Sequence, residues 1–429
     1  MKFYIRIFTI ACLFLAGLCV TSIPAQDWPQ WRGPFHNGSA QADNLPDTFG
    51  PDENLKWAVD LPGEGASTPI IVGDRIFLTA QDGEQTLWAF CLDRQDGSIK
   101  WKLEIGKGFA RGGGVTAAAP SASCDGERVY FFFGTGELLA TDLEGAILWQ
   151  RNVIEEYGDF ELIFKYGATP LLHEGRLYLS AIHGDHKTTD PDKSYLLAVD
   201  ARSGENVWKV DRHTDAVKES KQAYTSPYPF EHNGQTRLII LGGDYVTAHD
   251  LDSGKELWRS ANYNTKGQTA HRTVPTPASI DGMLICPAPR RTFLFAIDPD
   301  QNPDAANRPF AWTTEETGSD VCSPLVYENK LFVLDGRQKQ LSRIDPRSGK
   351  ILGSAKMDIR PPMDASPTAA DGKIFCVSKA GHVAVLSAED TPKVLHQIDL
   401  GGKDCRASIA IAHNQIFIRA NERLYCFGQ

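Results

Sequence analysis

The protein has 429 residues and a net charge of −10 at pH 7, with 44 basic and 54 acidic side chains. A chain this acidic is poorly suited to nucleic acid, because phosphate binding requires clustered lysine and arginine. Its nine cysteines include no adjacent pair and no Cys-x-x-Cys spacing, which excludes the disulfide framework of small secreted domains.

Residues 1–25 have the pattern of a cleaved secretory signal. Lys2 and Arg6 precede an apolar stretch over 7–20, and an Ile-Pro-Ala sequence follows it. The stretch is too short for a stable membrane anchor, and a lipoprotein signal is disfavoured because no small residue stands directly before Cys19. We expect an exported protein that is periplasmic, associated with the outer membrane or secreted, with no transmembrane segment after cleavage. Loss of the signal lowers the net charge to −12.

Residues 26–53 begin with DWPQWRGPFHNGSA, which is rich in proline, glycine and aromatic residues. This composition predicts an irregular N-terminal arm that lies over the folded body. Trp28 and Trp31 of the arm suit either of two roles: exposed platforms that stack on sugar rings, or anchors that hold the arm to the body. We favour the anchoring role.

A β-hairpin motif recurs along residues 54–429. The copy SYLLAVDARSGENVW over 194–208 shows a half-buried strand, a turn at Ser203-Gly204 and a returning strand that ends on Trp208. Similar copies end on Trp101, Trp149, Trp258 and Trp312, and an orphan final strand ends on Trp57. The periodic position of these indoles favours docking between neighbouring repeats over ligand binding.

A second strand pair precedes each hairpin, so the repeat is a unit of four strands. Its first strand follows a small residue and a proline, as at Thr68-Pro69, Ala119-Pro120 and Thr169-Pro170. Eight units follow one another, the last without its final strand. We therefore predict an all-β, eight-bladed β-propeller of four-stranded antiparallel blades over 54–429. The N-terminal strand near Trp57 completes the last blade and closes the ring.

The loops of such a fold divide into two faces. Tight turns occupy one face, whereas every long insertion falls on the other, which we expect to be the functional face. The links between blades supply a mixed, largely cationic set of side chains at the rim of the central channel: Arg111, Lys165, Lys221, His271, Arg272, Asp320, Asp364 and Arg406. These residues suit an anionic ligand, and they equally suit a solvated rim whose charges neutralise one another.

The longest connection between second and third strands, SAIHGDHKTTDPDKS, holds His183, Asp185 and His186. Two imidazoles three residues apart, with carboxylates nearby, can bind Zn²⁺ or another divalent ion. The same residues are common in an ordinary polar loop. The chain contains no GxSxG, HExxH or phosphate-binding glycine loop, so the sequence indicates no catalytic residue.

The patterns AVDARSGENVW and AHDLDSGKELW resemble the repeat of PQQ-like (pyrroloquinoline-quinone) β-propellers. The opening DWPQWRGP and the closing ASIAIAHNQIFIRANERLYCFG resemble exported bacterial members of that group, of the BamB-like type. This resemblance implies a non-catalytic scaffold at the cell envelope that binds protein partners or a ligand and needs no cofactor. The alternative that it implies is a quinoprotein dehydrogenase acting on alcohols or sugars with PQQ and Ca²⁺. Enzymes of that group carry a Cys-Cys pair over the cofactor, which this chain lacks.

Overall fold

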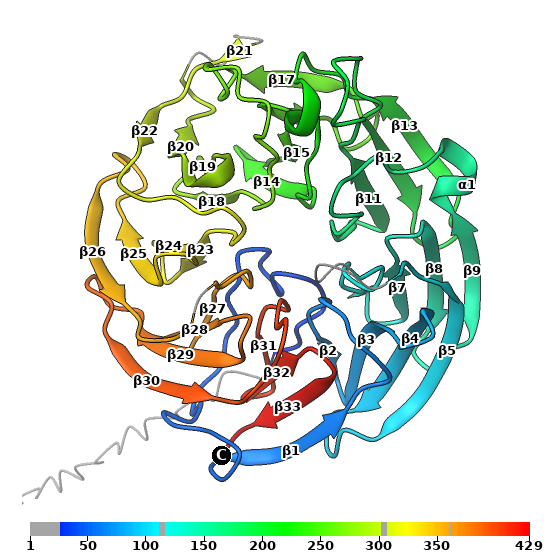
Figure 1. Ribbon diagram of the computed structural model, residues 1–429, viewed down its shortest axis with the longest axis vertical. Coiled ribbons are helices and arrows are strands. Elements are labelled where there is room, and N and C mark those ends of the chain that lie inside the picture. The colour runs from blue at the N-terminus through cyan, green and yellow to red at the C-terminus, as the bar shows by residue number, and fades with distance from the viewer. Residues whose placement is uncertain (1–25, 111–115, 302–306, 361) are drawn as a thin grey trace, which may run out of the picture.

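The computed structural model describes residues 26–110, 116–301, 307–360 and 362–429. Eight antiparallel sheets stand around a central channel, which confirms the predicted eight-bladed propeller (Figure 1). The predicted signal over 1–25 and the candidate Arg111 lie outside the described residues.

Four blades make up the first half of the ring. Blade 1 contains β2 (Ile70–Val72), β3 (Arg75–Gln81), β4 (Thr86–Asp93) and β5 (Ile99–Lys107). Blade 2 contains β6 (Ser123–Cys124), β7 (Arg128–Phe132), β8 (Glu137–Asp142) and β9 (Ile147–Asn152). Blade 3 contains β10 (Leu171–His173), β11 (Arg176–Ala181), β12 (Tyr195–Asp200) and β13 (Asn206–Asp211). Blade 4 contains β14 (Tyr228–His232), β15 (Gln235–Gly242), β16 (Tyr245–His249) and β17 (Glu256–Ser260).

The other four blades complete the ring. Blade 5 contains β18 (Ala278–Ile280), β19 (Met283–Pro287), β20 (Leu294–Ile297) and β22 (Trp312–Thr314). Blade 6 contains β23 (Leu325–Tyr327), β24 (Lys330–Asp335), β25 (Gln340–Ile344) and β26 (Ile351–Lys356). Blade 7 contains β27 (Thr368–Ala370), β28 (Lys373–Val377), β29 (His382–Ser387) and β30 (Val394–Asp399). Blade 8 contains β31 (Ala410–Ala412), β32 (Gln415–Ala420), β33 (Arg423–Phe427) and β1 (Leu55–Asp60).

The strand β1 closes the ring, as the sequence predicts. It pairs antiparallel with β33, so that Leu55 lies opposite Phe427 and Asp60 lies opposite Arg423. Because the two ends of the chain share one sheet, blade 8 has its full four strands.

Helical structure is almost absent from the described residues. The helix α1 (Val153–Tyr157) is capped by the side chain of Asn152, and two 3₁₀ turns span Lys218–Lys221 and Pro289–Arg291. No helix in these parts of the chain has the length and apolar character needed to cross a bilayer.

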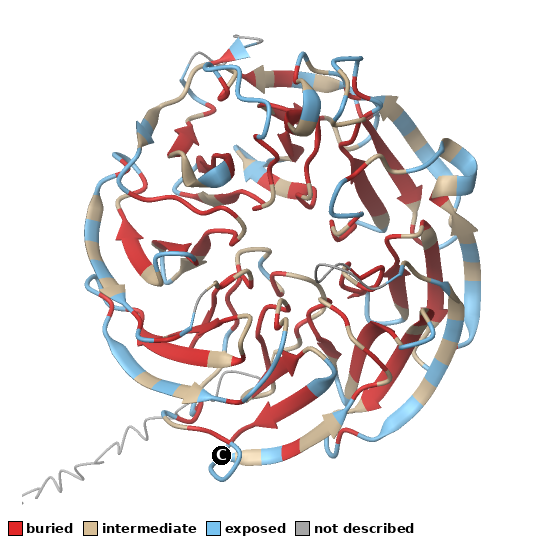
Figure 2. Ribbon diagram, in the orientation of Figure 1, coloured by how far each residue is buried: buried red, intermediate tan, exposed pale blue. Residues whose placement is uncertain are grey.

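Burial decreases from the channel towards the outside of each blade. Every residue of β12 except its last is buried, whereas β13 alternates between exposed and half-buried residues (Figure 2). This alternation is expected of an outermost strand with one face on its blade and one face in water.

The repeated tryptophans dock each blade on the next. At five blade boundaries the indole Nε1 donates a hydrogen bond of 2.9–3.0 Å to a backbone carbonyl in the neighbouring hairpin turn: Trp57 to Arg94, Trp101 to Leu143, Trp149 to Ala201, Trp208 to Leu251 and Trp312 to Pro346. The rings also bury apolar area against these turns, which stabilises the boundary.

Blade 5 departs from the regular repeat. Its insertion lies between β20 and β22, inside the last hairpin and therefore on the tight-turn face, so the expectation that every long insertion falls on the other face is wrong for blade 5. The insertion provides β21 (Asn307–Arg308), which adds a fifth, parallel strand to blade 4 opposite Arg259 and Ser260. The guanidinium of Arg308 lies 4.9 Å from the ring centre of Trp258. The indole of Trp258 thus packs against a guanidinium group, whereas the other five indoles contact a hairpin turn.

The N-terminal arm crosses the tight-turn face of the propeller. Trp28 is fully buried and forms an antiparallel bridge with Ile71 of blade 1. Arg32, also buried, donates to the carbonyls of Pro324 and Pro367 beside blades 6 and 7. The option of an exposed Trp28 platform is therefore wrong, because this indole packs inside the protein.

Candidate functional site

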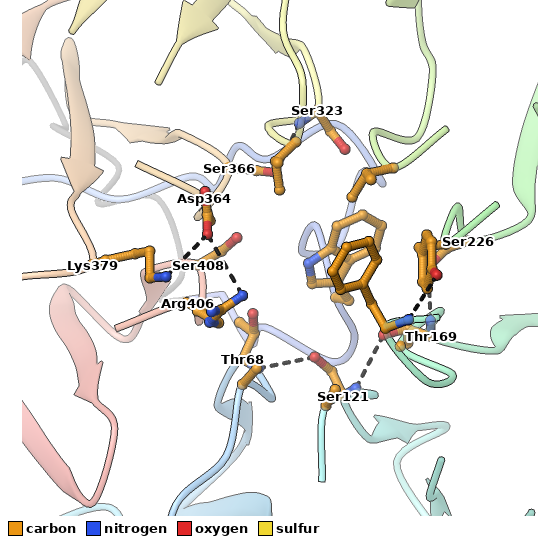
Figure 3. A pocket seen from close by; sticks show the side chains of 18 of the residues that line it. Thr68, Ser121, Thr169, Ser226, Ser323, Asp364, Ser366, Lys379, Arg406 and Ser408 are labelled. Atoms are coloured by element: carbon orange, nitrogen blue, oxygen red, sulfur yellow. Dashed lines mark hydrogen bonds and ion pairs between the residues drawn. The ribbon is translucent and has the colours of Figure 1, made fainter. Parts of the chain in front are cut away.

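The central channel forms a cup of about 550 Å³, within the range of small-molecule sites. The arm residue Trp31 lines this cup and also a smaller space on its arm side, so the arm closes one end of the channel. The other end is lined by links between blades and by second-to-third connections, which belong to the predicted functional face (Figure 3).

A ring of hydroxyl side chains surrounds the cup. In every blade a serine or threonine stands two residues before the innermost strand: Thr68, Ser121, Thr169, Ser226, Thr276, Ser323, Ser366 and Ser408. Six successive backbone N–H groups, from Thr68 to Ser323, donate to the hydroxyl of the next blade at 2.9–3.0 Å. The ring therefore connects blades 1 to 7, and all of its members except Thr276 line the cup with polar, uncharged groups.

The ring corrects one detail of the sequence analysis. In blade 2 the small residue before proline, Ala119, does not take the ring position. Ser121 does, because the proline there lies two residues earlier relative to β6 than in the other blades.

One wall of the cup is cationic. Five basic side chains line it, from the link before blade 5 around to the link before blade 8: Arg272, Arg290, Arg337, Lys379 and Arg406. The one carboxylate among the lining residues, Asp364, lies 3.6 Å from Arg406 and 4.0 Å from Lys379. Other carboxylates approach these cations from behind the wall, among them Asp320 at 3.2 Å from Arg337.

Two guanidinium groups of this wall are incompletely paired. Arg272 is 7% exposed, and its Nη1 is buried with no hydrogen-bond partner among the described residues. Its contacts with Glu219 and Asp320 are both 3.8 Å, longer than a hydrogen bond. Burial lowers the pKa of Arg272 from its usual value. Arg406 Nε is likewise buried and unpartnered. Unpaired buried donors of this kind are costly to the fold.

The described residues of the opposite wall are uncharged. Blades 1 to 4 supply alanines, ring hydroxyls and the aromatic side chains of Phe164 and Tyr224. The two walls meet where the guanidinium of Arg272 lies 5.1 Å from the ring centre of Phe164. The cup is therefore polarised across its width, with cations on one side and uncharged groups on the other.

Three of the predicted rim residues, Arg272, Asp364 and Arg406, line the cup. A fourth, Asp320, is buried behind the wall, where it accepts a hydrogen bond from the backbone N–H of Arg290. The structure thus brings these four residues together, three at the lining and Asp320 behind it.

Three other predicted rim residues do not line the cup. Lys221 is buried, and its ammonium group donates hydrogen bonds to the carbonyls of Thr188 and Asp190. His271 is buried beside Asp244, with 4.0 Å between His271 Nδ1 and the carboxylate. Lys165 is exposed, and its ammonium group lies 5.1 Å from the ring of Phe109.

The candidate metal ligands are not gathered into one group. His183 is buried and its Nδ1 accepts a hydrogen bond from the backbone N–H of Glu161. His186 Nδ1 lies 3.9 Å from Asp185 in a more exposed part of the loop. Over the described ranges, no three histidine, cysteine, aspartate or glutamate side chains meet in a way that could hold an ion.

Several cup residues escaped the sequence analysis. Arg290, Arg337 and Lys379 each follow the second strand of their blade by two or three residues. The sequence contains that signal, but it appears only when blades 5, 6 and 7 are aligned on their second strands. The hydroxyl ring has a similar signal at a fixed distance before each innermost strand.

Comparisons with known proteins agree with this architecture. Residues 50–209, 165–298 and 242–403 match the family described as outer membrane protein assembly factor BamB. The chain is 23% identical to a polyvinylalcohol dehydrogenase of a Pseudomonas species over 58% of this chain and 38% of that protein. It is 22% identical to BamB of Yersinia pestis over 66% of this chain and 62% of that protein.

The alignments thus span less than two thirds of either relative's length. The crystal structure of BamB from Moraxella catarrhalis superposes with a TM-score of 0.59 and 14% identity, over 87% of this chain and 98% of that one. Since the family match extends from residue 50 to residue 403, the chain belongs to the BamB family of PQQ-like β-propellers.

Proposed function

We propose that the protein is a non-catalytic, exported scaffold of the cell envelope that holds a small anionic ligand in its cup and offers its loop face to a protein partner. The observation that carries the proposal is the cup itself, which is lined by the incompletely paired guanidinium groups of Arg272 and Arg406. The envelope location is supported by the predicted signal and by relatives named as outer membrane assembly factors.

The physical argument concerns buried charge. A guanidinium that is removed from water without a complete set of acceptors destabilises the fold, and a bound oxyanion offsets that cost through charge-assisted, bidentate hydrogen bonds. Five cations face one lining carboxylate in a protein whose net charge is −10. Glu219, Asp320 and Asp404 pair with these cations from behind the wall, so cationic groups outnumber carboxylates only at the lining itself.

A protein partner suits the same face. Ile163 and Phe164, in the link before blade 3, are 37% and 47% exposed at the mouth of the cup. Apolar side chains exposed beside a charged rim are typical of interaction sites. Replacing Ile163 with aspartate is expected to weaken cross-linking to a partner in exporting cells without lowering the melting temperature.

The second candidate is a quinoprotein dehydrogenase, favoured by the 23% identity to a polyvinylalcohol dehydrogenase. PQQ is a tricarboxylate and suits the cationic wall. Ca²⁺ requires six to eight oxygen ligands, whereas Asp364 is the single lining carboxylate and already faces Lys379 and Arg406. The residues present thus fit the organic anion better than the cation.

Calorimetric titration tests the proposal. Tricarballylate, and PQQ with and without Ca²⁺, are titrated into the protein at constant ionic strength, followed by a dye-linked assay on alcohols and aldoses. We expect saturable anion binding that weakens at least about tenfold in the double variant Arg272→Gln/Arg406→Gln. The control Arg202→Gln, on an exposed hairpin turn, should bind as the wild type does. Absence of anion binding refutes the proposal, and Ca²⁺-dependent dye reduction favours the enzyme.

A further inference from the structure

The two walls of the cup differ in what they can recognise. The cationic wall can pair with an oxyanion, but it accounts for only part of the lining. The neutral wall and the hydroxyl ring need a ligand that is itself rich in hydroxyl groups and has an apolar face. A ligand that pairs with the cationic wall and also bonds to the neutral wall carries its negative charge at one edge.

The ring hydroxyls are available to such a ligand. In Ser121, Thr169, Ser226 and Ser366 the hydroxyl oxygen accepts a backbone N–H from the neighbouring blade. Among the described residues, none of these four hydroxyls donates its own hydrogen to a protein acceptor. Each can therefore donate to a ligand oxygen without losing the bond that ties the blades together.

The hydroxyl groups of Thr68 and Ser408 have more hydrogen-bonding capacity left for a ligand than the other ring hydroxyls. Both line the cup, and within the described ranges neither hydroxyl oxygen receives a ring N–H. A hydroxyl can donate one hydrogen bond and accept two, so these side chains suit a ligand hydroxyl, which is also both donor and acceptor. A carboxylate, by contrast, uses only their donor capacity.

Aromatic rings complete the neutral side. Trp31 closes the end of the cup near the arm, and Phe164 and Tyr224 line its wall. Aromatic side chains bury the apolar C–H faces of a ring whose edges carry polar groups. The cup thus offers aromatic surface, hydroxyl partners and a cationic wall within one space of about 550 Å³.

We propose that the ligand of the cup is an anionic sugar, a hydroxylated ring that carries a carboxylate, sulfate or phosphate group; this inference rests on the proposed function. The oxyanion lies against Arg272 and Arg406. The ring hydroxyls of the sugar bond to the serines and threonines around the channel, with Thr68 and Ser408 among them. Neutral sugars do not pair with the guanidinium groups, and simple polycarboxylates leave the acceptor capacity of the hydroxyl ring unused.

Titration calorimetry on the unmodified protein is the primary test. Glucuronate, glucose 6-sulfate, glucose 6-phosphate, glucose and tricarballylate are compared at constant ionic strength. At least one of the three anionic sugars should bind about tenfold or more tightly than both glucose and tricarballylate. Which of the three binds most tightly identifies the oxyanion.

Two sets of variants separate the walls. Thr68→Val with Ser408→Ala removes two hydroxyls that receive no ring N–H, and should weaken the anionic sugar about three- to tenfold and tricarballylate by a smaller factor. Arg272→Gln with Arg406→Gln should weaken both ligands. A melting curve of each variant checks the fold, and the ligand comparison on the wild type does not depend on them.

The outcomes distinguish this inference from the proposed function. If tricarballylate or PQQ binds as tightly as the anionic sugars, the sugar inference is overturned and the anion-binding scaffold stands. If glucose binds as tightly as glucuronate and the sugar esters, the assigned role of the cationic wall is wrong. If no anion binds at all, the proposed function falls together with the inference.

Discussion

Replacing Gly204 with alanine places a Cβ atom 2.6 Å from Trp149, the indole that docks blade 2 on blade 3. Two effects add. Gly204 has φ of +76°, and a left-handed conformation costs an alanine about 1–2 kcal/mol. The overlap with a docked indole adds about 1–3 kcal/mol, as overpacking does in other cores.

Gly175, in another turn of blade 3, is the matched control. Its φ is +73°, and a Cβ atom there meets nothing within 4 Å. Gly175→Ala should therefore cost only the conformational part, about 1–2 kcal/mol. The difference between the two variants isolates the contact with Trp149.

Urea unfolding followed by tryptophan fluorescence and circular dichroism measures both variants. Gly204→Ala should lower the unfolding midpoint clearly more than Gly175→Ala does. In a Trp149→Leu background the difference should largely disappear, because the clashing ring is gone. Equal losses for the two glycine variants in the wild-type background would show that the indole yields freely, and would refute tight docking.

Three further results are expected. Arg32→Met should lower stability by about 2 kcal/mol or more in urea unfolding, because it strands buried carbonyls that the guanidinium now satisfies; an unchanged midpoint contradicts this. The hydrogen bond from His413 lowers the pKa of Asp27 below 3.8 in the folded protein. The ionised Asp27 therefore stabilises the fold above pH 3.8, and this stabilisation is lost as the pH falls through the pKa of the folded state. Asp27→Asn should show a smaller loss of melting temperature between pH 5 and about 2 than the wild type does. Burial lowers the pKa of His249 from 6.5 to about 4. As the pH falls from 6.5 to 4, the unfolded state binds a proton before the folded state does, so the stability of the fold decreases. His249→Gln should flatten this part of the plot of melting temperature against pH, and an unaltered slope would contradict the prediction.

The propeller follows from the sequence because its signals are local and repeated. Alternating apolar residues, the turn at Ser203-Gly204 and the terminal Trp208 describe one hairpin, and the recurrence of that unit specifies the architecture. Ring closure could also be predicted, because one strand was missing at the end and one was left over near Trp57.

The cup was only partly predictable, because side-chain direction in irregular links depends on distant partners. Arg272 and Lys221 both stand in links and look equivalent in sequence. Lys221 turns away from the cup since the carbonyls of Thr188 and Asp190 satisfy its ammonium group. No local sequence pattern predicts that those carbonyls lie within hydrogen-bonding distance of Lys221.

The sequence by itself determined the repeat and the number of blades, since both depend on spacing along the chain. Only the tertiary structure decided that the arm closes one end of the channel, through contacts such as that of Arg32 with Pro367, which is 335 residues away. It also decided which charged side chains line the cup. Such contacts depend on how eight separately encoded blades meet around one axis, and the residues that meet there share no local signal.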